Sequence, residues 1–153
     1  MRILVFMNPK RKGNAFEREI AKLLGRWLYG DDHALRRNTG EPEDVYIGDI
    51  VPYRSDPRTS NFNYYVQCKT GYKRHCPDFW NFSLIKKWLT EALHKTEGHF
   101  QNIIFLVVRF KNRPILLFTN NKIDGKDPIL ILPVNNGGHF VDFYMYNFKK
   151  LIT

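Results

Sequence analysis

The chain has 153 residues, a net charge of +9 and 43% hydrophobic residues. This composition excludes a disordered chain, and no apolar run approaches the roughly 20 residues of a transmembrane helix. The basic excess favours a polyanionic partner; nucleic acid is the commonest, a membrane surface the next, and we expect no membrane partner. The length suits one domain, expected over residues 1–153. The brief apolar start lacks the charge order of an export signal, which predicts a cytoplasmic protein.

The first half of the chain is predicted to hold one helix followed by strands. The expected elements are a helix over 14–28, a short strand over 33–38, a loop over 39–44, a strand over 46–52, a polar turn over 54–61 and a strand over 62–69. Asn14 is the expected N-cap of the helix, Gly30 follows its end and Pro52 closes the second strand.

The second half is predicted to continue with a helix and more strands. The expected elements are a basic connection over 72–78, a helix over 79–97, strands over 103–110, 115–119 and 129–134, and a strand or aromatic-rich tail over 141–148. The continuous apolar run over 103–110 indicates a buried central strand. The order of elements predicts an α/β or α+β fold with a central mixed β-sheet flanked by helices.

Polar residues interrupt these elements at three places. Glu17 lies within the first helix, Asp49 within one strand, and Gln67-Cys68-Lys69 at the end of the next. Because residues two apart in a strand point to the same face, Gln67 and Lys69 project together and Cys68 faces the opposite layer. If the two strands pair as a hairpin, Asp49 lies beside Gln67 and Lys69.

This set of residues suits the hydrolysis of a phosphodiester. Carboxylate and carbonyl oxygens hold Mg²⁺, which activates a bound water and neutralises charge on the phosphate. A nearby lysine can orient that water or stabilise the transition state. Glu17 lies at the border of the buried helix face, from which it could point at the sheet.

The motifs carry a resemblance to a known family. An Asp followed by (Glu or Gln)-x-Lys on the next strand resembles the PD-(D/E)xK nuclease motif, which implies a restriction-endonuclease-like core. Arg11-Lys12-Gly13-Asn14-Ala15-Phe16-Glu17-Arg18-Glu19 resembles the Arg-Lys-Gly-x-x-x-Glu-Arg-Glu opening of archaeal-type Holliday junction resolvases and their phage relatives. Arg36-Arg37-Asn38-Thr39-Gly40, followed by Gly48-Asp49-Ile50, is similar to the phage members. The resemblance covers about residues 10 to 110.

The resemblance implies the roles of the site residues. Glu17, Asp49 and Gln67 would ligate Mg²⁺, with Mn²⁺ as an alternative, and the backbone carbonyl of Cys68 would add a ligand. Lys69 would be the catalytic lysine. Gln67 departs from the family, because most members have Glu there; the amide oxygen still ligates a hard cation, but the site loses one negative charge.

Several basic residues are candidates for contacts with DNA, although a plain solvated charge remains an alternative for each. They are Lys10, Arg11, Lys12, Arg36, Arg37, Lys73 and Arg74, with Thr39 near the scissile phosphate. The first three precede the predicted helix, whose N-terminal amides could share a phosphate with them. The cysteines, Cys68 and Cys76, are expected to be reduced.

The resemblance implies a Mg²⁺-dependent, structure-specific DNA endonuclease, and we expect a phage-type Holliday junction resolvase. Its expected partner is branched or duplex DNA, in the host cytoplasm if the protein is phage-encoded. Aromatic residues of the second helix and the tail suggest a homodimer, which suits the two symmetric scissile sites of a four-way junction. Three alternatives stay open: another repair or restriction-type nuclease, a nucleic-acid-binding module that does not cut, and a basic protein without a nucleic-acid role.

Overall fold

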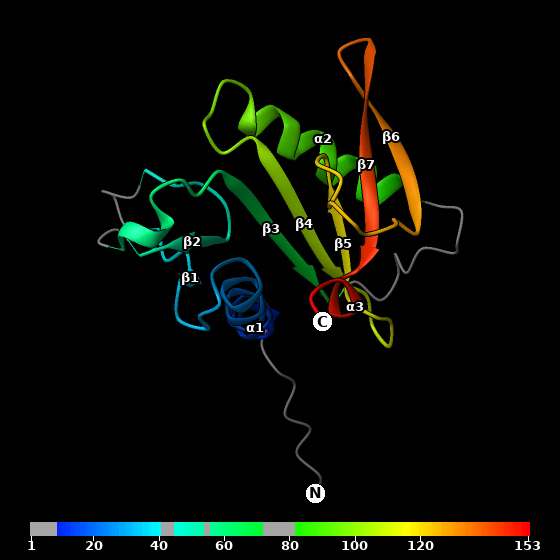
Figure 1. The fold of residues 1–153 in the computed structure, drawn as a ribbon. Coiled ribbons are helices and arrows are strands. Elements are labelled where there is room, and N and C mark those ends of the chain that lie inside the picture. The colour runs from blue at the N-terminus through cyan, green and yellow to red at the C-terminus, as the bar shows by residue number, and fades with distance from the viewer. Residues whose placement is uncertain (1–8, 41–44, 54–55, 72–81) are drawn as a thin grey trace, which may run out of the picture.

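The computed structural model describes residues 9–40, 45–53, 56–71 and 82–153, with side chains from residue 13 onward. Five strands form a mixed sheet with helices on both faces (Figure 1). The elements are α1 (Pro9–Tyr29), β1 (Leu35–Arg37), β2 (Ile50–Pro52), the 3-10 helix η1 (Pro57–Thr59), β3 (Tyr64–Thr70), α2 (Ser83–Thr96), β4 (Ile103–Arg109), β5 (Leu116–Thr119), β6 (Leu130–Asn136), β7 (His139–Asn147) and α3 (Phe148–Leu151).

The sheet has the strand order β3-β4-β5-β7-β6, so β3 and β6 are its two edges. β3 and β4 run parallel and are joined through α2, whereas the remaining pairs are antiparallel. β1 and β2 form a separate antiparallel ribbon. The predicted α/β fold with a central mixed sheet is confirmed, and residues 139–147 form a strand rather than a tail.

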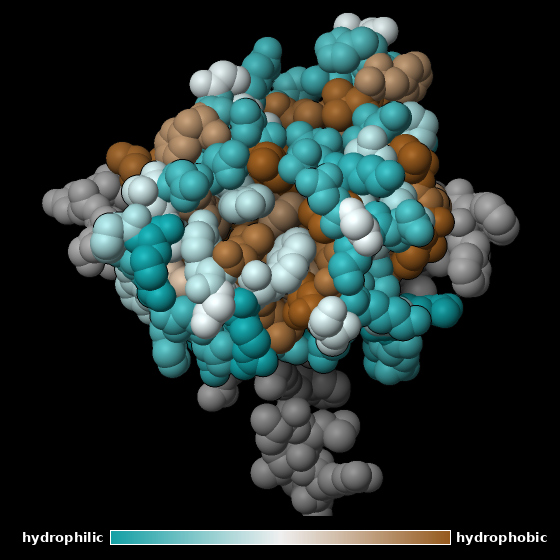
Figure 2. Space-filling view, viewed as in Figure 1, coloured by the Kyte–Doolittle hydropathy of each residue, from teal (hydrophilic) through white to brown (hydrophobic). Residues whose placement is uncertain are grey.

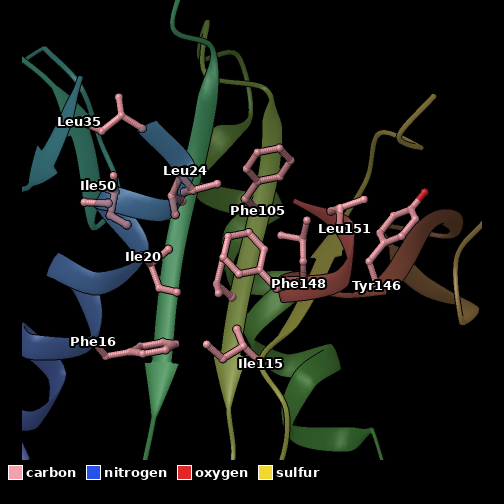
Figure 3. Packing of buried hydrophobic residues seen from close by; sticks show 14 of the residues in the cluster. Phe16, Ile20, Leu24, Leu35, Ile50, Phe105, Ile115, Tyr146, Phe148 and Leu151 are labelled. Atoms are coloured by element: carbon pink, nitrogen blue, oxygen red, sulfur yellow. The ribbon is translucent and has the colours of Figure 1, made fainter. Parts of the chain in front are cut away.

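The two faces of the sheet bury separate apolar clusters, because side chains alternate along each strand. α1 presents Phe16, Ile20 and Leu24 to one face, where they join a cluster that includes Phe105 of β4 (Figure 3). α2 covers the opposite face with a cluster that includes Leu89. The three-layer arrangement leaves the β3 edge between α1 and α2 (Figure 1).

The start of α1 differs from the prediction. The helix begins at Pro9, so Asn14 lies inside it and is not its N-cap. A proline at the first helical position has no amide hydrogen to satisfy and has a φ already suited to the helix, which explains the earlier start. The basic run 10–12 therefore lies within the helix instead of preceding it, and its side chains lie outside the described residues.

The strand predicted over 46–52 is also shorter than expected. Only Ile50–Pro52 is extended and paired, and its partner is β1, not β3. Gly48 has a φ of +100°, which interrupts the extended backbone just before Asp49. Asp49 therefore lies immediately before a strand rather than in the middle of one, and the predicted hairpin with the 62–69 strand does not form.

The other boundaries agree with the sequence to within a few residues. The second helix is described from Ser83 to Thr96, while the first residues of its predicted range and the connection over 72–78 lie outside the described residues. Gly98 has a φ of +71° just after this helix, as its role as a stop requires. Among the described residues no helix is long and apolar enough to cross a membrane.

Candidate active site

The segment before β2 docks on the open edge of β3 through Asp49. The amide of Asp49 donates a 2.7 Å hydrogen bond to the carbonyl of Val66, and its carboxylate Oδ2 accepts a 2.7 Å bond from the amide of Cys68. Val66 and Cys68 are two residues apart on β3, so the Val66 carbonyl and the Cys68 amide both point away from β4, towards the free edge of the sheet. A backbone amide that donates to a carboxylate makes one of the stronger hydrogen bonds, so the position of Asp49 is tied to the sheet edge.

Gly48 permits this close approach. A Cβ at this position would lie 2.9 Å from the carbonyl oxygen and 3.1 Å from the amide nitrogen of Val66. Its φ of +100° is also a conformation that other residues rarely adopt. Glycine is required here for two independent reasons, and both serve the placement of Asp49.

Gln101 holds the same segment from the other side, and the sequence analysis missed it. Its fully buried side chain accepts a 2.8 Å hydrogen bond from the amide of Ile47 and donates to the carbonyls of Ile47, at 2.8 Å, and Tyr64, at 2.9 Å. The amide therefore joins the segment that carries Asp49 to the start of β3. A single glutamine ahead of a strand does not repeat at helix or strand spacing, so periodicity does not predict its role. The one feature of the sequence that could indicate a buried amide is the long apolar run that follows Gln101.

Gln67 and Lys69 lie on the face of β3 that α2 covers, as their spacing predicts. The hydroxyl of Tyr65 donates a 2.9 Å hydrogen bond to Oε1 of Gln67. The ammonium of Lys69 lies 5.3 Å from the centre of the Trp88 ring on α2. The hydrogen bond restricts the rotamers of Gln67, and the cation–π contact restricts those of Lys69.

Glu17 reaches the edge from α1. Its carboxylate lies 3.7 Å from the guanidinium of Arg37 on β1, and its side chain is 19% exposed. Glu17 lines one cavity of about 470 Å³ together with the other predicted site residues. The residues that line it are Gly13, Phe16, Glu17, Asp49, Gln67, Cys68, Lys69, Thr70 and Gly71.

The two carboxyl groups of the cavity are in an environment that disfavours their charge. Burial, followed by the charge of Asp49, raises the pKa of Glu17, although Arg37 opposes this. Burial also raises the pKa of Asp49, against the lowering effects of the Cys68 amide and of Lys69 and Lys95. Two neighbouring buried carboxylates gain more from a bound cation than two solvated ones would.

The donor set fits a hard divalent cation. Glu17 and Asp49 supply carboxylate oxygens, and Gln67 supplies an amide oxygen. Among the described residues no group of three His, Cys, Asp or Glu side chains could hold a metal ion, so the amide is needed to complete the set. Burial and the adjacent carboxylates raise the pKa of the Cys68 thiol well above its ordinary value, so the thiol stays neutral and only its backbone carbonyl can serve.

The predicted DNA-binding residues have different outcomes. Arg36 and Arg37 lie on β1; Arg36 packs 5.8 Å from the ring of Tyr53, and Arg37 faces Glu17. Thr39 is exposed in the loop that follows. The side chains of Lys10, Arg11 and Lys12, together with Lys73 and Arg74, lie outside the described residues.

A comparison with protein families gives a match over almost the whole chain. The family model described as "Phage putative PDDEXK endonuclease" matches residues 8–151. The matched range contains every residue that lines the cavity. Neither the curated proteins nor the solved structures give a match.

The raised carboxyl pKa values predict a pH-dependent stability difference between the wild type and Asp49→Asn. Between about pH 4 and the raised pKa, the folded wild type binds more protons than the unfolded chain, so this contribution is lost as the pH rises. In EDTA near pH 7.5, Asp49→Asn should be more stable than the wild type, because the amide keeps this buried position uncharged. Urea unfolding should show this difference growing as the pH rises from about 4 to 7.5.

The control for this prediction is the exposed Asp142→Asn, which should behave like the wild type at both pH values. Mn²⁺ should stabilise the wild type and Asp142→Asn but not Asp49→Asn. A stability difference that shrinks as the pH rises from about 4 to 7.5 would contradict the prediction.

Proposed function

Because the chain belongs to this phage PDDEXK endonuclease family, we propose that it is a metal-dependent endodeoxyribonuclease that cuts branched DNA as a Holliday junction resolvase in the host cytoplasm. The observation that carries the proposal is the convergence of Glu17, Asp49, Gln67 and Lys69 on one cavity. These residues come from α1, from the segment before β2 and from β3, so side chains that are distant in the sequence line the same cavity.

In the proposed site, Glu17, Asp49 and Gln67 hold Mg²⁺ or Mn²⁺, with the Cys68 carbonyl as a further oxygen. When bound, such an ion lowers the pKa of a coordinated water and neutralises charge on the phosphate. The protein's own part is to fix the oxygens before the substrate arrives. The bond from the Cys68 amide fixes Asp49, and the bond from Tyr65 fixes Gln67.

Lys69 supplies the positive charge that faces the reacting phosphate in this proposal. It lines the cavity beside Gln67, and its charge lowers the pKa of Asp49. A lysine held near the phosphate stabilises the negative charge that grows in the transition state. Trp88 limits the positions of its ammonium through the cation–π contact.

Branched DNA is the proposed substrate because two features favour recognition of shape and backbone. The net charge of +9 suits binding to phosphates. Five of the described strands form the central sheet, and β1 and β2 are only three residues each, so the described strands offer little to read base edges in a groove. The motif around Glu17 resembles the opening of Holliday junction resolvases, which also favours branched DNA as the substrate.

A homodimer is proposed through the part of the sheet that β6 and β7 form on the same face as α1, beyond the strands that α1 contacts. Ile129, Ile131 and Phe140 are 59%, 52% and 67% exposed there. Figure 2 shows brown apolar residues gathered on the right, where Figure 1 draws β6. Pro133 on the edge strand disfavours the addition of another strand, so a second copy would pack against the face instead.

The proposed activity predicts cleavage of a labelled four-way junction with Mg²⁺ or Mn²⁺ and none in EDTA. Asp49→Ala and Lys69→Ala should each lower the cleavage rate by at least about 100-fold while junction binding persists, because the first removes a metal ligand and the second a charge that faces the reacting phosphate. The control is Lys122→Ala, which removes an exposed lysine that does not line the cavity. Wild type that binds junctions but never cuts them would refute the enzyme proposal in favour of a binding module.

Gln67→Glu tests the neutral ligand. The added charge should tighten Mn²⁺ binding by about tenfold in calorimetry, since affinity for hard cations rises with the number of charged oxygens. Asn121→Asp adds the same charge on an exposed loop and should leave the affinity unchanged. Unchanged affinity in Gln67→Glu would remove Gln67 from the proposed metal ligands.

The proposed dimer predicts a concentration-dependent dimer in sedimentation at micromolar concentration. The double variant Ile131→Glu/Phe140→Ser should sediment as a monomer because both changes make the apolar face polar. Phe100→Ser removes an equally exposed aromatic residue next to β4 and should stay dimeric. A wild-type chain that is purely monomeric would contradict the proposal.

A further inference from the structure

A second cavity adjoins the candidate active site on the α2 side of the β3 edge. It has a volume of about 410 Å³. The residues that line it are Ile47, Gly48, Asp49, Tyr65, Gln67 and Lys95. Asp49 and Gln67 line both cavities, so this pair forms the boundary between them.

Lys95 is the cation of this second cavity, and nothing in the proposed chemistry uses it. Trp88, Glu91 and Lys95 succeed one another at helical spacings of three and four, which places them on one row of α2. Trp88 contacts Lys69, and the charge of Glu91 acts on Tyr65. The row therefore follows the β3 edge and brings the exposed Lys95 to its Asp49 end.

We propose that this cavity binds a phosphate of the nucleic-acid backbone next to the scissile phosphate, and that Lys95 is the residue that binds it. The inference rests on the proposed nuclease function. A strand that crosses the β3 edge with one phosphate beside Glu17, Asp49 and Lys69 continues into the space beside Lys95. The charge on Lys95 then adds affinity for the strand beside the reacting phosphate.

Two features of the cavity favour a phosphate over other occupants. Its side-chain oxygen ligands for a hard cation are those of Asp49 and Gln67, which the proposed metal site already uses, so the cavity adds no third ligand for a second cation. Among the described residues no ion pair or hydrogen bond involves the ammonium of Lys95, which leaves it available to an anion.

The first test is binding of a fluorescent four-way junction to the full chain in EDTA. Lys95→Ala should weaken binding by about three- to tenfold and lower the slope of log Kd against log salt by about one, as the loss of one phosphate contact requires. Lys86→Ala is the matched control, since it removes an exposed lysine about half a turn around the same helix. With metal, Lys95→Ala should raise the half-saturating DNA concentration and leave the saturated cleavage rate within about twofold.

The second test replaces single phosphates next to the scissile one by uncharged methylphosphonates. One position should weaken binding by the wild type and by Lys86→Ala, and cause little further loss in Lys95→Ala, because the two changes remove the same contact. The inference would be overturned if Lys95→Ala bound the unmodified junction as tightly as the wild type does. It would also be overturned if every methylphosphonate weakened binding by Lys95→Ala as much as it weakens binding by the wild type. Neither result would contradict the proposed nuclease function. A wild-type chain that neither binds nor cuts DNA would overturn the proposed function as well.

Discussion

The arrangement of the candidate site depends on the pair of hydrogen bonds between Asp49 and the outer edge of β3. An edge strand presents amides and carbonyls without a strand partner, and each must be satisfied by another group or by water. Here Asp49 satisfies two of them: its amide serves Val66 and its carboxylate serves Cys68. The carboxylate proposed to hold a metal therefore has its position set by the same bonds that complete the sheet edge.

Residues without reactive groups maintain this docking. Gly48 lets the two backbones approach, and Gln101 ties Ile47 to Tyr64 with an amide that is shut off from water. A buried amide that loses its partners costs free energy, so the three bonds of Gln101 resist any shift of the segment. The position of Asp49 therefore depends both on the backbone conformation of Gly48 and on the buried hydrogen bonds of Gln101.

The sequence predicted the fold well where side-chain periodicity carries the information. The apolar run of β4 and the two-residue spacing of Gln67 and Lys69 gave the central strand and the face that these residues share, because alternation follows directly from strand geometry. Strand pairing is less accessible: nothing local to Asp49 says that β2 pairs with β1, since pairing depends on contacts distant in sequence. Gln101 was missed for the same reason, because its partners lie more than thirty residues away.

The charges around the site explain how a neutral Gln67 can be accommodated. Burial already raises the pKa values of Glu17 and Asp49, and the charge of Asp49 raises that of Glu17 further. A third carboxylate would add repulsion among these groups. Arg37 faces Glu17, so a divalent cation must share or displace an existing partner. The lost negative charge weakens the attraction for that cation, yet the phosphate of a nucleic acid brings negative charge to the same place. In the proposed complex the substrate itself then supplies part of the charge that holds the metal, so that each favours binding of the other.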